Sequence, residues 1–569
     1  MTEFLLVFAL AIALGWPLGR YLAAVMRGAP MRGDRLFGLI ERPVYALLGV
    51  DPSRGMGWKG YAKAFLLSNL VLGVVVWVFL MTQAWLPLNP NDIPNMRWDL
   101  ALHTMVSFLT NTNQQHYSGQ AQLSYLAHAS AIVGLQVVTP MMGLALVAAT
   151  LRGLFGGREK SAATTDTTTN GDADVGNYWA DVIRPAVRFL LPLCLVWSLA
   201  LTSQGVPATL QGGPVARPVD ASAQMAEQKI PLGPVAPMVA IKQLGTNGGG
   251  WYGPNSAVPL ENPTPFSNLL ETLALILIPV SIAFMVGSFT GRRKFTALVF
   301  GTMLTMSLVS ASTAVWSESL SGTSSDIALM EGKEVRFGAA PSALWAAFTT
   351  QTSNGSVNAM HDSLAPLTGL VTISNMLVNA IWGGVGCGLQ QFLVYLLLSV
   401  FLAGLMTGRT PELFGRKIEA HEVKLLAALV LLQPLALLTF TAITLAVPSI
   451  TGNSNPSFHG ISQVFYEYVS AFANNGSGFE GLGDATHWWN LSASLMLALG
   501  RYPPLIIPLA IAGSLARKRA TPEGTGTLKV ETPTFALTLI AVAVILTLLQ
   551  FMPVLVLGPV ADHLALSAL

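Results

Sequence analysis

Charged residues are scarce in this chain of 569 residues, since Asp, Glu, Lys and Arg together make up only 11%. A soluble domain carries about 25%, so the composition excludes an ordinary soluble protein. Hydrophobic residues reach 52%, a share typical of membrane proteins. The net charge of +2 is too small to indicate a nucleic-acid partner.

Cysteine is nearly absent as well. The only two, Cys194 and Cys387, lie far apart in the sequence, each within an apolar stretch. A disulfide framework or a structural zinc site needs more cysteines at closer spacing. Neither is predicted, and both thiols are expected to be buried and inert.

The chain also lacks the motifs of ATP hydrolysis. It contains neither an Asp-Lys-Thr-Gly phosphorylation sequence nor a G-x-x-x-x-G-K-[ST] phosphate loop. The predicted cytoplasmic loops are too short for a nucleotide-binding domain. We therefore expect no catalytic residues and no ATP hydrolysis by this chain itself.

Long apolar stretches are abundant. A membrane-spanning helix needs about 20 predominantly apolar residues, and ten segments meet this requirement. The first segment is followed, not preceded, by basic residues, so we expect a retained anchor and not a signal peptide. An all-helical polytopic membrane protein is predicted, with spans near 4–26, 64–84, 125–151, 183–203, 268–290, 295–316, 365–407, 423–447, 488–512 and 532–557.

Lys and Arg are distributed unevenly over the loops between these segments. Alternate loops, beginning with 27–63, contain 20 basic residues, whereas the other loops contain 6. Because basic residues are retained on the cytoplasmic side, the first set of loops is predicted to be cytoplasmic. Both chain termini are then expected outside.

Four polar, uncharged loops lie on the predicted outer side. Gly and Asn adopt left-handed backbone angles at little cost, so such loops can direct carbonyl oxygens toward a common axis. Rings of carbonyl oxygens replace the water shell of potassium in selective filters, which predicts a cation pore. Ordinary turns are the alternative, but they explain one such loop better than four in matching positions. The loops are 110–113, 245–249, 353–356 and 474–478.

Each loop follows a short apolar stretch, such as 343–352 or 461–473, that is too short to span a bilayer. We predict four repeats of outer helix, short pore helix, polar loop and inner helix around a central pore. The C-terminal ends of the pore helices would direct partial negative charge at the pore centre. The outer stretch 203–268 is long and rich in proline, and we expect it to cover the second loop as a cap.

Five motifs resemble the potassium-binding A chains of the bacterial Kdp potassium-transporting ATPase, in the same order and over nearly the whole chain. They are TNTNQQHYSG (110–119), QLGTNGGGWYGPNSAVPLENPTPFSN (243–268), SNGSVNAMHDSLAPL (353–367), GGVGCGL (383–389) and ANNGSGFEGL (473–482). The resemblance implies four fused channel-like repeats with one additional helix on each side. The implied divisions are an extra helix in 1–30, pore repeats in 60–152, 180–291, 295–408 and 420–513, and an extra helix in 530–569.

The resemblance also implies a function. The chain would be the channel-like subunit of a high-affinity, ATP-driven potassium uptake system in the bacterial inner membrane. It would bind extracytoplasmic K⁺ in a selectivity filter and deliver the ion to a P-type ATPase B chain. A C chain and a small F chain complete such assemblies, and the transported K⁺ is the only ion or cofactor implied.

Two other functions remain open at this point. One is a stand-alone secondary potassium transporter of the Trk, Ktr or HKT kind, which shares the four-repeat core and needs no ATPase partner. The other is an unrelated transporter with inverted repeats and a substrate site at the membrane midplane. The second alternative predicts paired broken helices in two halves, whereas one clear break is visible.

Filter residues follow from the family motifs. Backbone carbonyls are expected to supply most K⁺ ligands, while Asn and Thr side chains brace the loops. Gln115 occupies the family's usual Gln position in the vestibule. The expected filter residues are Asn111, Thr112 and Asn113, then Gly245, Thr246 and Asn247, then Asn354, Gly355 and Ser356, and finally Asn475, Gly476 and Ser477.

Two features inside the predicted spans suggest a gate or tunnel. Gly383, Gly384, Gly386 and Gly388 lie near the middle of a span that is too long for one crossing. A broken helix below the filter is predicted, and a packing face of small residues is the alternative. Arg501 lies within the ninth span, where a charge costs about 3 kcal/mol or more. By resemblance it lies under the filter and opposes leakage of K⁺; a structural Arg bound to helix-end carbonyls is the alternative.

Three positions differ from the family pattern. Gln114 stands where Trp is usual, Gln120 where Glu is usual, and Asn379 where relatives commonly carry Glu. The first two changes reduce charge and bulk at the outer mouth. A gate that depends on an acid at position 379 is therefore not expected in this chain.

Overall fold

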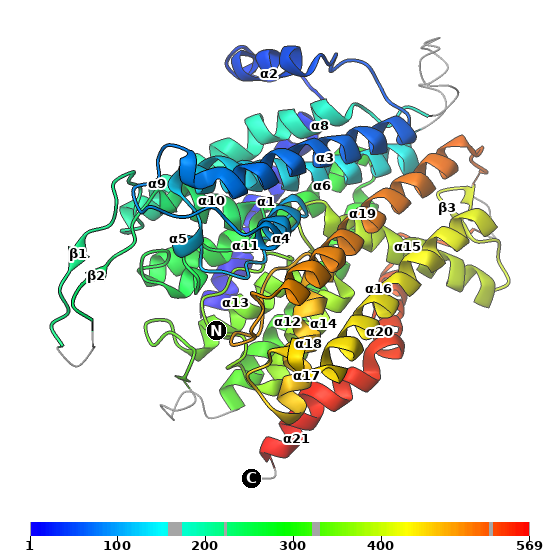
Figure 1. The fold of residues 1–569 in the computed structure, drawn as a ribbon. Helices are drawn as coiled ribbons and strands as arrows, with labels where there is room; N and C mark the ends of the chain where they lie inside the picture. The colour runs from blue at the N-terminus through cyan, green and yellow to red at the C-terminus, as the bar shows by residue number, and fades with distance from the viewer. Residues whose placement is uncertain (1, 157–172, 221–224, 321–329, 523–526, 568–569) are drawn as a thin grey trace.

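The computed structural model describes residues 2–156, 173–220, 225–320, 330–522 and 527–567. In these residues the regular secondary structure is helical apart from two short antiparallel hairpins (Figure 1). Ten of the described helices are long and apolar enough to cross a membrane. The predicted all-helical membrane fold with ten spans is confirmed.

Four repeats of outer helix, short helix, polar loop and inner helix follow one another along the chain. The outer helices are α3 (Trp58–Thr82), the continuous α8, η4 and α9 (Tyr178–Pro185, Ala186–Leu190, Leu191–Ser203), α12 (Arg293–Leu320) and α16 (Ala420–Ala446). The short helices are α4 (Trp98–Leu109), α10 (Val235–Leu244), α13 (Ala339–Gln351) and α18 (Ser457–Phe472). The inner helices are η2 with α6 (Ala127–Ile132, Val133–Phe155), α11 (Pro265–Thr290), α14 with α15 (Pro366–Val378, Cys387–Met406) and α19 (His487–Arg517).

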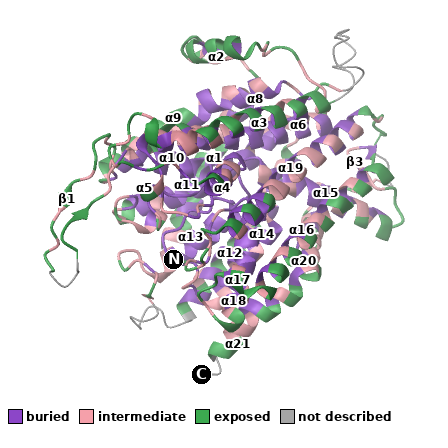
Figure 2. Ribbon diagram, viewed as in Figure 1, coloured by how far each residue is buried: buried purple, intermediate pink, exposed green. Residues whose placement is uncertain are grey.

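Burial separates inner from outer helices. In an 18-residue apolar window, 83% of residues are buried in α11 and 78% in the span formed by η2 and α6. The corresponding share is 28% in the span from α8 to α9 and 22% in α16. Figure 2 shows the same contrast between buried helices at the centre and exposed faces at the periphery. Exposed apolar faces of this kind fit a hydrocarbon surrounding.

Local sequence signals start and stop the buried helix α11. Its first turn has a capping box, in which Thr264 accepts from the Ser267 N–H and the Ser267 hydroxyl accepts from the Thr264 N–H. Pro265 follows at the first helical position, where its missing N–H costs nothing. The helix ends at Gly291, with a left-handed φ of 78°.

Two further long helices flank the repeats. α1 (Thr2–Met26) packs along α11, where a Cβ on Gly19 would collide with the Ser281 carbonyl. The C-terminal helix is formed by α20 (Pro533–Leu555), η8 (Val556–Val560) and α21 (Ala561–Ser567). The C-terminus lies at the opposite end of the molecule from α2 (Asp34–Leu48) in Figure 1.

The connections contain short elements. Strands β1 (Val215–Ala216) and β2 (Gln228–Lys229) form a hairpin that extends away from the helices (Figure 1). The expected cap over the second loop is therefore wrong for this hairpin, although Trp251 and Tyr252 are buried. The remaining elements are η1 (Gln83–Trp85), α5 (Gly119–Gln122), η6 (Asn255–Ala257), α17 (Pro448–Thr451), and the hairpin of β3 (Glu412–Leu413) and β4 (Arg416–Lys417).

The predicted break in the seventh span is present. α14 ends at Val378, α15 begins at Cys387, and the residues between them are not helical. Asn379 ends α14 with a left-handed φ of 46°, while Gly383 and Gly386 have φ values of 60° and 80°. The glycines permit angles that other residues adopt at a cost.

Candidate functional site

The four polar loops begin with the same turn. In each, the N–H of one loop residue donates to the carbonyl of the helix residue five positions earlier, and we call this loop residue central. The four bonds run from Thr112 to Ser107 (3.0 Å), Asn247 to Lys242 (3.0 Å), Asn354 to Thr349 (2.9 Å) and Asn475 to Ser470 (2.9 Å). The sequence repeat is therefore also a repeat of backbone geometry.

A left-handed residue flanks each central residue on both sides. A residue other than glycine pays about 1–2 kcal/mol for this conformation, so its recurrence at matching positions indicates one constraint on all four loops. The preceding residues are Asn111, Thr246, Ser353 and Asn474, with φ of 63°, 49°, 49° and 54°. The following residues are Asn113, Gly248, Gly355 and Gly476, with φ of 54°, 73°, 87° and 104°.

The expected filter residues lie in these loops, but the register differs in three of them. In the second loop the expected set begins one residue early, at Gly245, which has a φ of −77° and ends α10. Gly248 is the equivalent of Gly355 by backbone geometry and lies outside the expected set. In the third and fourth loops the expected sets begin one residue late, so they leave out the left-handed Ser353 and Asn474.

The loops form a closed ring. A Cβ added to the second flanking residue of one loop would collide with the central carbonyl of the next loop. The colliding pairs are Gly248 with Asn354, Gly355 with Asn475, and Gly476 with Thr112. The first and second loops close the ring, because Asn113 Nδ2 donates to the Gly248 carbonyl at 3.1 Å. Backbone atoms from four distant parts of the chain thus meet around one axis.

Side chains hold neighbouring loops together. Asn354 Nδ2 donates to the Lys242 carbonyl at 2.9 Å, and Asn475 Nδ2 donates to the Thr349 carbonyl at 2.8 Å. Each of these bonds links a loop to the short helix of the preceding repeat. Gln115, the expected vestibule residue, both donates to the Gly250 carbonyl (3.2 Å) and accepts from its N–H (2.8 Å). These side chains brace the ring.

The ring is buried, uncharged and rich in unpaired oxygen. All central and flanking residues are buried except the partly exposed Gly476. Among the described residues, Asn113 Oδ1 and Asn247 Oδ1 have no hydrogen-bond donor. An unpaired buried acceptor is costly, and a cation would satisfy it. The C-terminal ends of four short helices add partial negative charge without any carboxylate in the loops.

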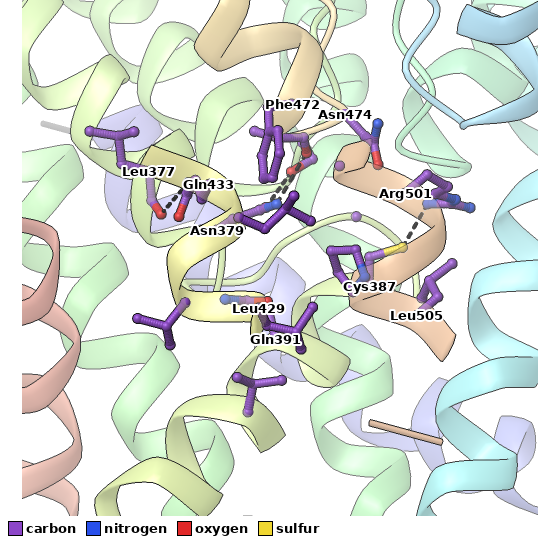
Figure 3. Close-up of a pocket in the computed structure, with 18 of the residues that line it drawn as sticks. Leu377, Asn379, Cys387, Gln391, Leu429, Gln433, Phe472, Asn474, Arg501 and Leu505 are labelled. Atoms are coloured by element: carbon purple, nitrogen blue, oxygen red, sulfur yellow. Dashed lines mark hydrogen bonds between the residues drawn. The ribbon is translucent and has the colours of Figure 1, made fainter. Parts of the chain in front are cut away.

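A cavity lies directly below the ring. It is lined by Asn111 and Ser353 from the loops, by Arg501 and Cys387, and laterally by residues of α16 and α20. The volume that the centres of water molecules can occupy is about 60 Å³. One water needs about 10–15 Å³ of such volume. The cavity therefore has room for several waters. Figure 3 shows its wall between the broken helix and α19.

The break between α14 and α15 contacts the underside of the ring. The Val385 N–H donates to Thr246 Oγ1 at 2.9 Å, and Asn379 bridges Ser353 Oγ (2.7 Å) and the Ala473 carbonyl (3.1 Å). A Cβ on Gly386 would collide with the backbone of α6 at Gly143. The break thus packs against the second and third loops of the ring and against α6.

Arg501 is buried in the cavity wall, and few groups around it balance its positive charge. Its side chain on α19 points toward Cys387 (Figure 3), with Nη1 at 2.6 Å from Sγ, and Nη2 donates to the Thr139 carbonyl at 3.1 Å. Its exposed fraction is 2%, and Nε has no partner. Among the described residues, no carboxylate forms an ion pair with Arg501 within 4.0 Å, and its side-chain partners are Cys387 Sγ and the Thr139 carbonyl. A fixed positive charge therefore faces the cavity below the ring.

A buried polar network behind the second loop was not anticipated from the sequence. Lys242 of α10 forms an ion pair with Glu261, and both side chains are fully buried. Gln243 donates to Glu271 at 2.9 Å and accepts from Ser356 Oγ at 2.8 Å. The sequence shows only that acidic residues occur in 261–271. Which residues pair with them depends on the fold.

The chain is similar to a described family over nearly its full length. The family model "KdpA: Potassium-transporting ATPase A subunit" matches residues 5–564. Two similar proteins are described as "Potassium-transporting ATPase potassium-binding subunit". The one from Gloeobacter violaceus is 47% identical, covering 96% of this chain and 95% of that protein. The one from Pseudomonas putida is 44% identical, covering 99% and 98%.

A solved structure shares the fold. It is the crystal structure of the potassium transporter TrkH from Vibrio parahaemolyticus, which matches with a TM-score of 0.51 at 14% identity. The match covers 88% of this chain and 97% of that chain. At this identity the likeness concerns architecture alone.

Proposed function

Because the chain belongs to the family of potassium-transporting ATPase A subunits, we propose that it is the potassium-binding, channel-like subunit of a high-affinity, ATP-driven potassium uptake complex. It takes K⁺ from the outer side and delivers the ion to an ATP-hydrolysing subunit. The energy comes from that partner, since this chain has no phosphorylation or nucleotide-binding motif.

The closed ring of four loops is the observation that supports this function most directly. It places backbone carbonyls of Thr112, Asn354 and Asn475 against the neighbouring loops, and Asn247 is the equivalent residue of the second loop. Dehydrated K⁺ takes such carbonyls in place of water. We propose these four residues and their left-handed neighbours as the filter, which adds Gly248, Ser353 and Asn474 to the residues expected from the sequence.

The route below the filter follows from the cavity. The break between α14 and α15 acts as a gate under the ring. Gly386 allows its close approach to α6, Gly384 faces the ring, and Gly383 and Gly388 pack against each other within the break. Arg501 repels a cation that continues straight on. The cavity extends sideways toward α16 and α20, which is the direction we assign to delivery.

We place the chain in the bacterial inner membrane with the ring outside. The uneven distribution of Lys and Arg orients it, and both termini are then outside. The partners are the B, C and F chains of a Kdp complex, together with membrane lipid. The division into four pore repeats and two flanking helices gives the filter its fourfold arrangement.

Potassium-stimulated ATP hydrolysis tests the proposal. The chain is co-expressed with B, C and F chains, the complex is purified, and hydrolysis is titrated with K⁺ and with Na⁺. We expect stimulation by K⁺ at far lower concentration than by Na⁺. An ATP hydrolysis rate that does not depend on K⁺, or a chain that does not purify with the B chain, contradicts the assignment.

A second arm addresses the stand-alone transporter. The chain alone is reconstituted in liposomes, and K⁺ flux is measured without ATP. We expect negligible flux, because Arg501 and the break obstruct the direct path. Rapid K⁺ flux through the chain alone would favour the stand-alone transporter instead.

A further inference from the structure

A buried cluster of His116, Glu467 and Asp484 lies behind the first and fourth loops. One ligand-type atom from each residue lies within 4.8 Å of the others. His116 and Glu467 are buried, and Asp484 is partly exposed in the outer connection before α19. Ligands of a tetrahedral zinc ion lie about 3.3 Å apart, as bond lengths of about 2.0–2.1 Å require. Binding therefore requires the three ligand atoms to draw closer together than they lie in this structure.

The hydrogen bonds around His116 fix the direction of its lone pair. Asp99 can only accept, so Asn490 Nδ2 is the atom that donates to Asp99 Oδ2 at 2.8 Å. Asn490 Oδ1 must then accept from His116 Nδ1, which lies 2.8 Å away. In the neutral ring the proton is therefore on Nδ1, and Nε2 is left with a lone pair facing the cluster.

This chain of contacts is the arrangement that orients metal-binding histidines. A ligating His usually donates its other N–H to an oxygen acceptor, which sets the tautomer and the ring direction. Asp99 is itself held by Arg97 Nη2 at 2.9 Å and by His487 Nδ1 at 2.9 Å. His103 stacks on His116 with ring centres 3.7 Å apart. The ring of His116 is thus fixed on both its edge and its face.

Unpartnered atoms point to a missing ligand. Among the described residues, His116 Nε2 and Gln114 Oε1 are buried and have no hydrogen-bond partner. Glu467 lies 3.5 Å from Nε2 and accepts from Gln114 Nε2. Two carboxylates beside a neutral imidazole leave excess negative charge in a buried place, which is expensive unless a cation balances it.

We propose that His116, Glu467 and Asp484 bind a divalent transition-metal ion of the zinc class through one imidazole nitrogen and two carboxylate oxygens. The imidazole nitrogen favours such ions over Mg²⁺ and Ca²⁺, which take oxygen ligands. Gln114 directly follows the first loop, and a Cβ on Gly478 of the fourth loop would lie 2.9 Å from Glu467 Oε2. A bound ion therefore ties these two loops of the ring together on their outer side.

Zinc retention by the purified complex tests this site independently of transport. The complex is dialysed against Zn²⁺ with excess Mg²⁺, desalted, and analysed for metal, and Co²⁺ absorption reports on the ligand geometry. We expect one more retained Zn²⁺ per complex in the wild type than in His116→Asn or Glu467→Gln. Asn490→Ala removes the orienting acceptor of His116 and the hydrogen bond to Asp99 but no proposed ligand, and it should weaken Zn²⁺ binding about 10- to 100-fold.

His459→Asn is the matched control. His459 lies on α18, the helix that contains Glu467, but carboxylates of Asp362 (2.9 Å) and Asp562 (2.8 Å) occupy both of its ring nitrogens. This variant should retain Zn²⁺ like the wild type. Equal zinc in the wild type and in the His116 and Glu467 variants, or a wild type that retains none, overturns the site; a proton on Nε2 would then neutralise the cluster.

Discussion

Substitution of Gly355 by Ala should weaken potassium recognition more than any other single methyl group in the third repeat. Gly355 has a φ of 87°, and an added Cβ would collide with the Asn475 carbonyl of the neighbouring loop. The methyl group therefore acts on the backbone twice. It strains the residue, and it displaces a carbonyl that we assign to the ion.

The strain sets a lower estimate of the effect. A left-handed residue with a Cβ costs about 1–2 kcal/mol, and 1.4 kcal/mol corresponds to a tenfold change in affinity. If the loop relaxes to relieve this strain and the binding free energy of K⁺ weakens by the same amount, the K⁺ concentration for half-maximal ATP hydrolysis rises about 5- to 30-fold. Selectivity over Na⁺ should fall as well, because the ring geometry no longer fits one ion size.

Gly338 offers a control with a similar positive φ and no collision. Its φ is 86°, and a Cβ there would meet nothing within 4 Å. Both variants are measured by K⁺-stimulated ATP hydrolysis of the purified complex, with folding checked by size-exclusion chromatography. Gly338→Ala should keep the wild-type K⁺ dependence. An unchanged K⁺ dependence in Gly355→Ala, or an equal shift in both variants, would refute the ring as the ion site.

Three further predictions concern charge. Arg501→Gln should produce an ATP-independent K⁺ leak in liposomes containing the chain, because the only charge facing the cavity from α19 is removed. Liposomes that show no K⁺ leak would contradict the proposal that Arg501 blocks the direct path of K⁺. Glu261→Gln leaves Lys242 buried without its counter-charge and should lower the free energy of unfolding by about 3–5 kcal/mol, whereas a Lys242→Met, Glu261→Gln double variant should recover part of it in thermal melts. Two carboxylate partners raise the pKa of His459 to about 9, so the stabilisation that its charge provides is complete below its unfolded pKa of about 6.5 and is lost as the pH rises through 9. The difference in melting temperature between the wild type and His459→Asn should therefore shrink as the pH rises through 9. A difference that grows with pH would contradict this.

The number and positions of the membrane spans were predictable because they depend on composition. Ten apolar segments of sufficient length appear in the sequence and again as helices, since the bilayer requirement acts on each segment separately. The break in the seventh span was predictable for the same reason. Its length exceeded one crossing, and glycines from Gly383 onward marked the position.

The register of the loops was not predictable from glycine alone. Thr246 takes a left-handed angle that residue preference would assign to Gly245, and Ser353 takes one that preference would assign to Asn354. The helix-end turn determines these angles, because the central N–H must reach a carbonyl five residues earlier. Tertiary geometry thus overrides local preference at the positions that matter most for the site.

Contacts between distant residues were also beyond the sequence. His116 and Glu467 belong to the first and fourth repeats, and only the closed ring brings them within 3.5 Å. The position of the outer hairpin of β1 and β2 also differs from the cap that the sequence led us to expect. Its strand residues are mostly exposed, the apolar Val215 included, so their composition did not reveal that the hairpin extends away from the second loop.

The position of the bound ion tests the central claim most directly. The purified complex is prepared with Tl⁺ or Rb⁺ in place of K⁺, and the ion is located by anomalous scattering or by density difference. The account predicts an ion on the axis of the ring, coordinated by carbonyls of Thr112, Asn247, Asn354 and Asn475. An empty ring, with the ion found only elsewhere in the chain, would contradict it.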